Sequence, residues 1–315
     1  MKRKTESCSF RTTIGGQALI EGILMRGPRK QAIVCRTADG LTEKVEEILP
    51  LKERFPVLGL PLIRGSAALI SSLYRGMQAL TWSASLVPSD EQSGSDPIDR
   101  WIEAHFEGEK AQKLMISVAV AAGVVLSLFL FVFLPAFLVG LIAPLRTNYL
   151  VRNLCEGLLR IAILLIYMRL CCEMSEVKRL FSYHGAEHKT IFCYEHGKEL
   201  TVENVRPESR FHPRCGTSFL LVVIVVSILI NAVVRLDNTF ARMGCHLLLL
   251  PVVMGVSYEI NLWCGRHDNW LSAVLSAPGK WLQRMTTNEP DDGMIECAIR
   301  AMELVIPEEK GTDIW

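Results

Sequence analysis

Long apolar runs in the middle of the chain predict membrane-spanning helices. Residues 114–143 include no charged residue, and about 20 apolar residues are enough for a helix to cross a bilayer. Pro135 lies inside this run and predicts a kink. Further apolar runs cover residues 150–174, 217–234 and 243–263. The pattern therefore predicts an α-helical polytopic membrane protein with about four transmembrane helices.

The second of these runs carries more charged side chains than the others, among them Arg152, Glu156, Arg160 and Arg169. A charge at the centre of a bilayer costs at least ~2.5 kcal/mol. We therefore expect these groups near a helix end or facing the other helices. Glu156 and Arg160 are four residues apart, so they can form an ion pair on one helix face.

The segments before the apolar runs predict a small α+β region. Alternating polar and apolar residues predict strands at 32–36 and 41–48, joined by a turn at Ala38-Asp39-Gly40 into a β-hairpin. The glycines of residues 15–28 indicate tight backbone. Residues 64–83 predict an amphipathic helix that docks on the hairpin or on the membrane surface.

Lysine and arginine are concentrated between the second and third apolar runs, and the positive-inside rule therefore places that segment in the cytoplasm. Four crossings then bring both termini to the same side. The expected organisation is an N-terminal cytoplasmic region (1–88), a linker and membrane approach (89–112), a four-helix membrane domain (113–265) with a His-rich cytoplasmic insert (173–216), and a helical cytoplasmic tail (266–315).

Composition agrees with a membrane protein and excludes some other classes. Half of the residues are hydrophobic, and 21% are charged, which leaves sizeable aqueous parts. A net charge of +1 argues against a nucleic-acid binder held by bulk electrostatics. The 10 cysteines include no CxxC pair, so they predict reduced, buried thiols and not a disulfide framework. Residues 1–10 are polar and basic and predict no cleavable signal peptide.

The segment His184-Gly185-Ala186-Glu187-His188 predicts a metal site. On a helix, His184 and His188 share a face and Glu187 lies one step around it. Two imidazoles can bind a divalent metal, and an adjacent unbound carboxylate can deprotonate water, as in the inverted zincin order His-x-x-Glu-His. We expect two zinc ligands and a catalytic base, Glu187. A polar helix with two unrelated histidines is the alternative, and Gly185 weakens the helix by ~1 kcal/mol.

Two candidates for a further ligand follow in residues 211–217, namely His212 and Cys215. Pro213 stiffens the backbone between them. The alternative for this segment is a helix start that contains a buried cysteine. Because histidine and cysteine are concentrated in one short polar stretch, the two segments together favour a metal site.

Topology adds Glu259 as the preferred third ligand. This residue lies near the cytoplasmic end of the fourth apolar run, at the expected depth of the His184 segment, and inverted zincins use a downstream glutamate. His246 would lie ~20 Å away along the same helix, too far to join. The alternative for Glu259 is an ion pair with an arginine such as Arg266.

Motifs along nearly the whole chain resemble those of a known family. They are Gly-Gly-Gln-Ala at 15–18 with Glu21-Gly22, Met-Arg-Gly-Pro at 25–28, Tyr-His-Gly-Ala-Glu-His at 183–188, Phe-His-Pro-Arg-Cys-Gly-Thr-Ser-Phe at 211–219, Ser-Tyr-Glu at 257–259, Trp-Leu-Gln-Arg at 281–284, Thr286-Thr287, and Glu-Pro-Asp-Asp at 289–292. Together they resemble the YqhQ-like family of bacterial multipass membrane proteins. The resemblance implies a bacterial plasma-membrane location and a metal site, and it supplies no substrate.

Two classes of function fit these features. The first is a membrane-embedded, peptidase-like hydrolase that uses a divalent metal, zinc, on a membrane-protein or lipid-linked substrate. The second is a non-catalytic metal-binding scaffold or sensor, and metal transport is a weaker third. The lipid bilayer is the expected partner in each case. The sequence does not decide whether the protein also forms a homo-oligomer. Glu187 separates the first two classes, because a structural site would tolerate glutamine there.

Overall fold

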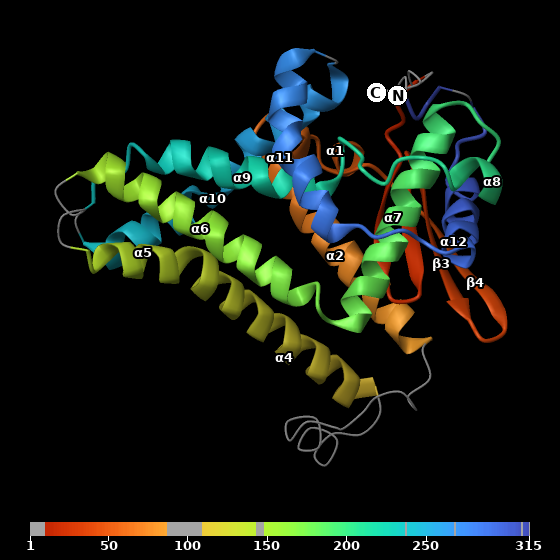
Figure 1. Cartoon of the computed structure of the whole chain (residues 1–315), viewed down its shortest axis with the longest axis horizontal. Helices are drawn as coiled ribbons and strands as arrows, with labels where there is room; N and C mark the ends of the chain where they lie inside the picture. Colours follow the sequence, from red (N-terminus) through yellow and green to blue (C-terminus); the bar gives the residue numbers. More distant parts are fainter. Residues whose placement is uncertain are drawn as a thin grey trace. The chain divides into compact units, whose positions relative to one another are not determined.

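The computed structural model of the chain describes residues 10–86, 109–142, 148–236, 238–267, 269–309 and 311–314. The described part is mostly helical, with a four-stranded sheet near the N-terminus (Figure 1). Of the predicted linker and membrane approach (89–112), residues 89–108 lie outside it. The helices are α1 (Leu51–Arg54), η1 (Pro56–Gly59), α2 (Ile63–Ser85), α4 (Glu109–Leu128), η3 (Phe129–Phe133), α5 (Leu134–Gly140), α6 (Tyr149–Cys171), α7 (Ser175–Glu195), α8 (Val202–Val205), α9 (Gly216–Asn231), α10 (Thr239–Arg266), α11 (Trp270–Thr286) and α12 (Asp292–Glu303).

The sheet is antiparallel and follows the chain order, β1-β2-β3-β4. Its strands are β1 (Gly15–Leu19), β2 (Gly22–Arg26), β3 (Lys30–Thr37) and β4 (Gly40–Glu47). The predicted hairpin is confirmed as β3–β4, where Gly40 has a φ of 120° that suits glycine. The glycine-rich run before it is a second hairpin, β1–β2, which the sequence pattern did not reveal.

Apolar side chains pack on both faces of this sheet, because alternate residues of a strand point to opposite sides. Ile23 and Met25 join a core with α7 and α12. Leu24 and Ile33 face the other way and pack against Ala79 of α2. The sheet is therefore a layer between α7 and α12 on one face and α2 on the other, and Figure 1 shows α7 and α12 beside the strands.

Helix α2 is also held against α10. A Cβ at Gly65 would lie only 3.0 Å from the Cα of Gly255, so the two backbones approach as closely as glycines allow. The Arg64 guanidinium donates from Nε to Glu259 Oε1 over 2.6 Å and forms an ion pair with that carboxylate. The predicted amphipathic helix is thus confirmed, and it docks on the sheet and on α10.

Among the described residues, two helical stretches are long and apolar enough to cross a membrane, by length and composition. They are Ser117–Gly140 and Phe240–Arg266, which correspond to the first and fourth predicted spans. The third is the apolar helix α9, which has 16 residues, and the second is the charged helix α6. The two long stretches indicate membrane association. Near Pro135 the first stretch passes through a π-helical turn, η3, and changes direction (Figure 1).

The polar side chains of α6 find partners inside the described helices. The Glu156 carboxylate is 2.9 Å from a guanidinium nitrogen of Arg242. Arg160 donates to Ser227 Oγ over 2.8 Å. The sequence pattern suggested an ion pair between Glu156 and Arg160, and the ion pair that Glu156 forms is with Arg242.

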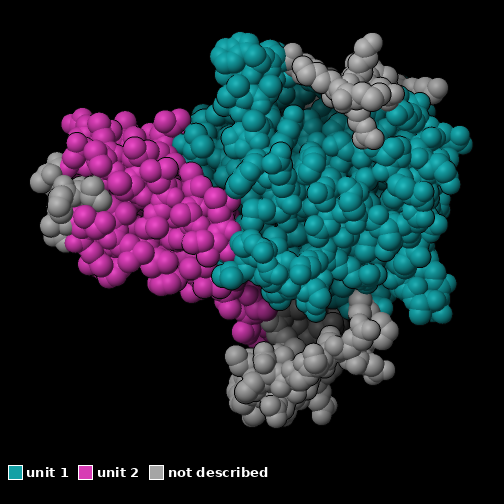
Figure 2. All heavy atoms as spheres, in the orientation of Figure 1, with its two compact units in different colours: residues 1–87, 167–226, 251–315 teal, residues 88–166, 227–250 magenta. Residues whose placement is uncertain are grey.

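Two compact units make up the chain (Figure 2). The first contains residues 1–87, 167–226 and 251–315, and the second contains residues 88–166 and 227–250. The predicted N-terminal region, the His-rich insert and the tail all fall in the first unit. This unit also contains every predicted metal ligand.

Candidate metal centre

Helix α7 runs through the His-Gly-Ala-Glu-His segment without a break, which confirms the predicted helix. Gly185 belongs there because another segment crosses α7 at this turn: a Cβ at Gly185 would overlap the carbonyl oxygen of Asn288. The backbone N–H of Asn288 also donates to the carbonyl of Phe181 over 2.9 Å. Glycine is therefore required for the close approach, and its cost in helix propensity is offset by packing.

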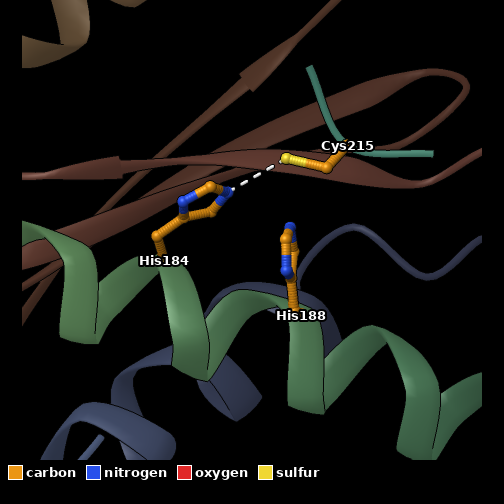
Figure 3. Close-up of side chains that lie close together, drawn as sticks. All are labelled: His184, His188 and Cys215. Carbon is orange, nitrogen blue, oxygen red and sulfur yellow. Dashed lines mark hydrogen bonds between the residues drawn. The ribbon is translucent and has the colours of Figure 1, made fainter. Parts of the chain in front are cut away.

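Three side chains come together above this turn, namely His184, His188 and Cys215 (Figure 3). Their ligand atoms all lie within 4.8 Å of one another, and His184 Nε2 is 3.2 Å from Cys215 Sγ. A tetrahedral zinc ion separates its nitrogen and sulfur ligands by roughly 3.3–3.6 Å. The three atoms are therefore spaced so that small side-chain movements would bring them around one ion.

Both imidazoles are fixed by the same kind of hydrogen bond. His184 Nδ1 is 2.8 Å from the carbonyl oxygen of Thr286, and His188 Nδ1 is 2.6 Å from that of Arg210. Because a carbonyl oxygen can only accept, each Nδ1 must carry the proton. This leaves Nε2 as the ligand nitrogen, and in the described residues the buried His188 Nε2 has no hydrogen-bond partner. Such bonds orient the histidines of metal sites.

Cys215 lies directly before the first residue of α9, where the helix N-terminus favours a thiolate. Burial alone would raise the pKa of this thiol, but the charges of His188 and His184 bring it well below its usual range. Burial alone would lower the pKa of His184, but its interaction with Cys215 raises that pKa to about 9. Each group therefore favours the charged form of the other, and a thiolate ligand beside a cation is favoured in the same way.

Glu187 faces the N-terminal sheet from the same helix. Its Oε1 accepts a hydrogen bond of 2.9 Å from the Gly16 amide of β1. Its Oε2 is buried and has no hydrogen-bond partner among the described residues, and burial raises the pKa of the carboxyl. Glu187, His188 and Cys215 line one pocket of about 410 Å³. The carboxylate is therefore near the three candidate ligands without being one of them.

His212 lines this pocket too, but its nitrogens are already engaged. Its Nε2 is 3.4 Å from Glu195 Oε2, and its Nδ1 accepts from the Arg214 amide at 3.4 Å. Glu195 in turn pairs with the Arg214 guanidinium. The side-chain amide of Gln283 in α11 accepts a hydrogen bond from the His212 backbone N–H over 2.8 Å and donates one to the His212 carbonyl over 2.7 Å. His212 thus belongs to the wall of the pocket and not to the ligand set of this structure.

Glu259 is not in this cluster, so the expectation that it would complete the ligand set is not met. Its carboxylate is bound by Arg64, and its Oε1 is also 3.5 Å from the Leu62 amide. The alternative, an ion pair with an arginine, is the arrangement found, although the arginine is Arg64 and not Arg266. Cys215, and not Glu259, is therefore the side chain that lies beside the two histidines in this structure.

Several residues that shape the site were not recognised as part of it. Gly16 holds Glu187 through its backbone amide, and the carbonyls of Thr286 and Arg210 orient the two histidines. A contact made by a backbone N–H or carbonyl does not depend on the type of residue, so the sequence does not reveal it. Gly16, Gln283 and Thr286 do fall within the motifs that carry the family resemblance, and this was the available signal.

Comparison with known proteins places these motifs in a family. The family model described as "Protein of unknown function (DUF1385)" matches residues 60–308. The uncharacterized protein YqhQ of Bacillus subtilis (strain 168) is 34% identical over 295 residues, which cover 91% of this chain and 90% of that protein. No solved structure matches the chain.

Proposed function

Because the chain belongs to the DUF1385 family of proteins of unknown function, its chemistry has to be argued from its own residues, and we propose a metal-dependent hydrolase. The proposed ligands are His184, His188 and Cys215, with zinc as the first candidate because nitrogen and thiolate donors suit it. One observation carries the proposal: both histidines are held by backbone carbonyls so that their second nitrogens face one buried cysteine.

The proposed catalytic group is Glu187. Three protein ligands leave one position of a tetrahedral ion open, which is the usual arrangement of catalytic zinc sites. A divalent metal supplies Lewis acidity and makes water easier to deprotonate. The buried Glu187 Oε2, which has no partner among the described residues and lines the same pocket, would take the proton. The bond from the Gly16 amide to Oε1 would keep the carboxylate in place during this step.

The proposal includes a site at the cytoplasmic face of the bacterial plasma membrane. We propose that α6 and α9 cross the bilayer together with the two long apolar stretches. The internal pairing of Glu156 with Arg242 and of Arg160 with Ser227 supports this, because charged groups in a spanning helix need such partners. The excess of lysine and arginine in residues 172–216 supports the orientation.

Metal analysis of the purified full-length protein tests the ligand set. The wild type is expected to hold about one zinc ion per chain, as a three-ligand site would. The double variant His184→Ala/His188→Ala and the single variant Cys215→Ser should each lose it. His267→Ala is the matched control, because this exposed histidine contacts Trp263, through a ring stack and a hydrogen bond to its carbonyl, and is not one of the clustered candidate ligands. Full metal content in a folded double variant would show that the ion binds elsewhere.

Cobalt substitution separates a catalytic site from a closed structural one, which is what the scaffold or sensor alternative requires. A small anion such as azide should change the visible spectrum of the cobalt-loaded protein if a coordination position is open. Glu187→Gln should keep the cobalt spectrum and lose the cellular function that the wild-type gene supports. An azide-insensitive spectrum, together with full function of Glu187→Gln, would favour the scaffold or sensor instead.

A further inference from the structure

The pocket beside His188 and Cys215 also contains a pair of arginines. Arg26 ends β2, and Arg75 is on α2. Gln31 lies directly opposite Arg26 in the β2–β3 register, and Arg75 donates to Gln31 Oε1 over 3.3 Å. Arg26 and Arg75 are therefore both neighbours of Gln31 at the wall of the pocket.

Neither guanidinium has a carboxylate partner among the described residues. The Arg26 guanidinium forms no hydrogen bond or ion pair there, and that of Arg75 bonds to a neutral amide. The nearby Glu46 is occupied, because Gln31 donates to its Oε2 over 2.7 Å and Lys44 lies 2.8 Å from its Oε1. Glu46 therefore offsets part of the charge of Arg75 from a distance, but the two half-buried arginines place positive charge at the pocket without an ion pair of their own among the described residues.

The remaining charged groups of the pocket do not cancel this pair. Arg214 is neutralised by Glu195. Among the described lining residues Glu187 is the one acid, and it lies on the α7 face of the sheet, bonded to Gly16. Burial, and after it the charge of Arg75, lower the pKa of the Arg26 guanidinium, as expected when two like charges are held near each other.

We propose that this pocket binds a phosphorylated ligand, with the phosphate group on Arg26 and Arg75 and the rest of the molecule reaching toward His188 and Cys215. A guanidinium fork matches the oxygens of a phosphate, and the two negative charges of a phosphomonoester balance two arginines. A pocket of about 410 Å³ has room for such a group and a small attached moiety. As the substrate class of the hydrolase, this inference rests on the proposed function, but binding of the phosphate itself needs no metal.

Calorimetric titration of the full-length protein in a neutral detergent tests the inference. The soluble probes are inorganic phosphate and glycerol 3-phosphate, added to the zinc-loaded wild type and to the His184→Ala/His188→Ala variant. Arg26→Gln and Arg75→Gln should each weaken binding at least about 10-fold, as expected for one charge-assisted contact. Arg29→Gln is the matched control, because this exposed arginine pairs with Glu53 outside the pocket and should bind normally.

A third probe distinguishes the source of the phosphate. Phosphatidylcholine vesicles with and without phosphatidic acid should bind differently if the ligand is a lipid headgroup, and the difference should vanish in Arg26→Gln. Binding of the soluble probes alone identifies a soluble phosphorylated ligand. The inference is overturned if no probe binds, or if binding is the same in both arginine variants as in the wild type. If Arg26→Gln does not fold, Arg75→Gln alone tests the inference, because Arg75 lies on a partly exposed side of α2 and its substitution should disturb the fold less.

The same titrations keep the two proposals apart. Arginine-dependent phosphate binding in a protein that binds no metal supports the pocket and contradicts the hydrolase. Metal bound by the three proposed ligands without any arginine-dependent binding supports the metal site and contradicts the phosphate assignment.

Discussion

Adding one methyl group to Gly16 should disturb Glu187, whereas adding it to the neighbouring Gly15 should not. Both glycines lie in β1, and neither has a positive φ. An ideal Cβ at Gly16 would lie 2.6 Å from the carbonyl oxygen of Leu24 and 3.0 Å from Cδ of Glu187. An ideal Cβ at Gly15 would meet nothing within 4 Å. Gly15→Ala is therefore a matched control on the same strand.

The size of the effect follows from these contacts. Ordinary contacts to a Cβ begin near 3.4 Å, so the methyl group of Gly16→Ala must push its neighbours by roughly 0.4–0.8 Å, which is overpacking that costs about 1–3 kcal/mol. Both substitutions gain about 0.4–1 kcal/mol because alanine restricts the unfolded chain. Gly16→Ala should thus be less stable than Gly15→Ala by about 1–3 kcal/mol, or by several degrees in Tm.

Thermal unfolding of both variants in detergent, followed by intrinsic tryptophan fluorescence, measures this difference. The disturbed Glu187 adds a second readout: Gly16→Ala should reduce the cellular function while it keeps its metal, because the three proposed ligands do not touch Gly16. Equal melting temperatures for the two variants would refute the close packing of β1 on Glu187. They would also remove the geometric reason for a glycine at position 16.

Two further predictions test the rest of the arrangement. Glu259→Gln should leave metal content unchanged and lower the melting temperature, because the carboxylate binds Arg64 and not the ion; loss of metal in this variant would restore Glu259 as a ligand. A cysteine at Lys198, in the segment rich in basic residues, should stay unlabelled by a membrane-impermeant thiol reagent in intact cells, and strong labelling relative to permeabilised cells would reverse the proposed orientation.

The helix of the metal site could be predicted because its signal is local. A spacing of four residues puts His184 and His188 on one face whatever the rest of the chain does. The β3–β4 hairpin was predictable for the same reason, since its turn residues sit between two alternating strands. The β1–β2 hairpin was missed because glycine at Gly15, Gly16 and Gly22 weakens the alternation that identifies a strand.

The side chain beside the two histidines could not be predicted because its position depends on which elements pack together. Glu259 was preferred on the assumption that a carboxylate at the cytoplasmic end of α10 would reach the histidines. The structure instead docks α2 there, with Arg64 on that carboxylate. Nothing in the pattern of α2 says which helix it will contact. Glu259 is preferred to Cys215 on sequence alone because the sequence does not show that the segment before α9 folds back over α7.

The pairing of the chain's two ends within the first unit also governs the order in which that unit can be assembled. Thr12 and Ile314 form a β-bridge, and α12 covers the Ile23 face of the sheet. At the usual pace of translation, β4 leaves the ribosome tens of seconds before α12. During that interval the apolar stretches are made, while one face of the sheet still lacks its cover. The proposed ligands of α7 and the carbonyl of Thr286 therefore meet only late in synthesis, and a metal ion would encounter its complete site only after α11 has been made.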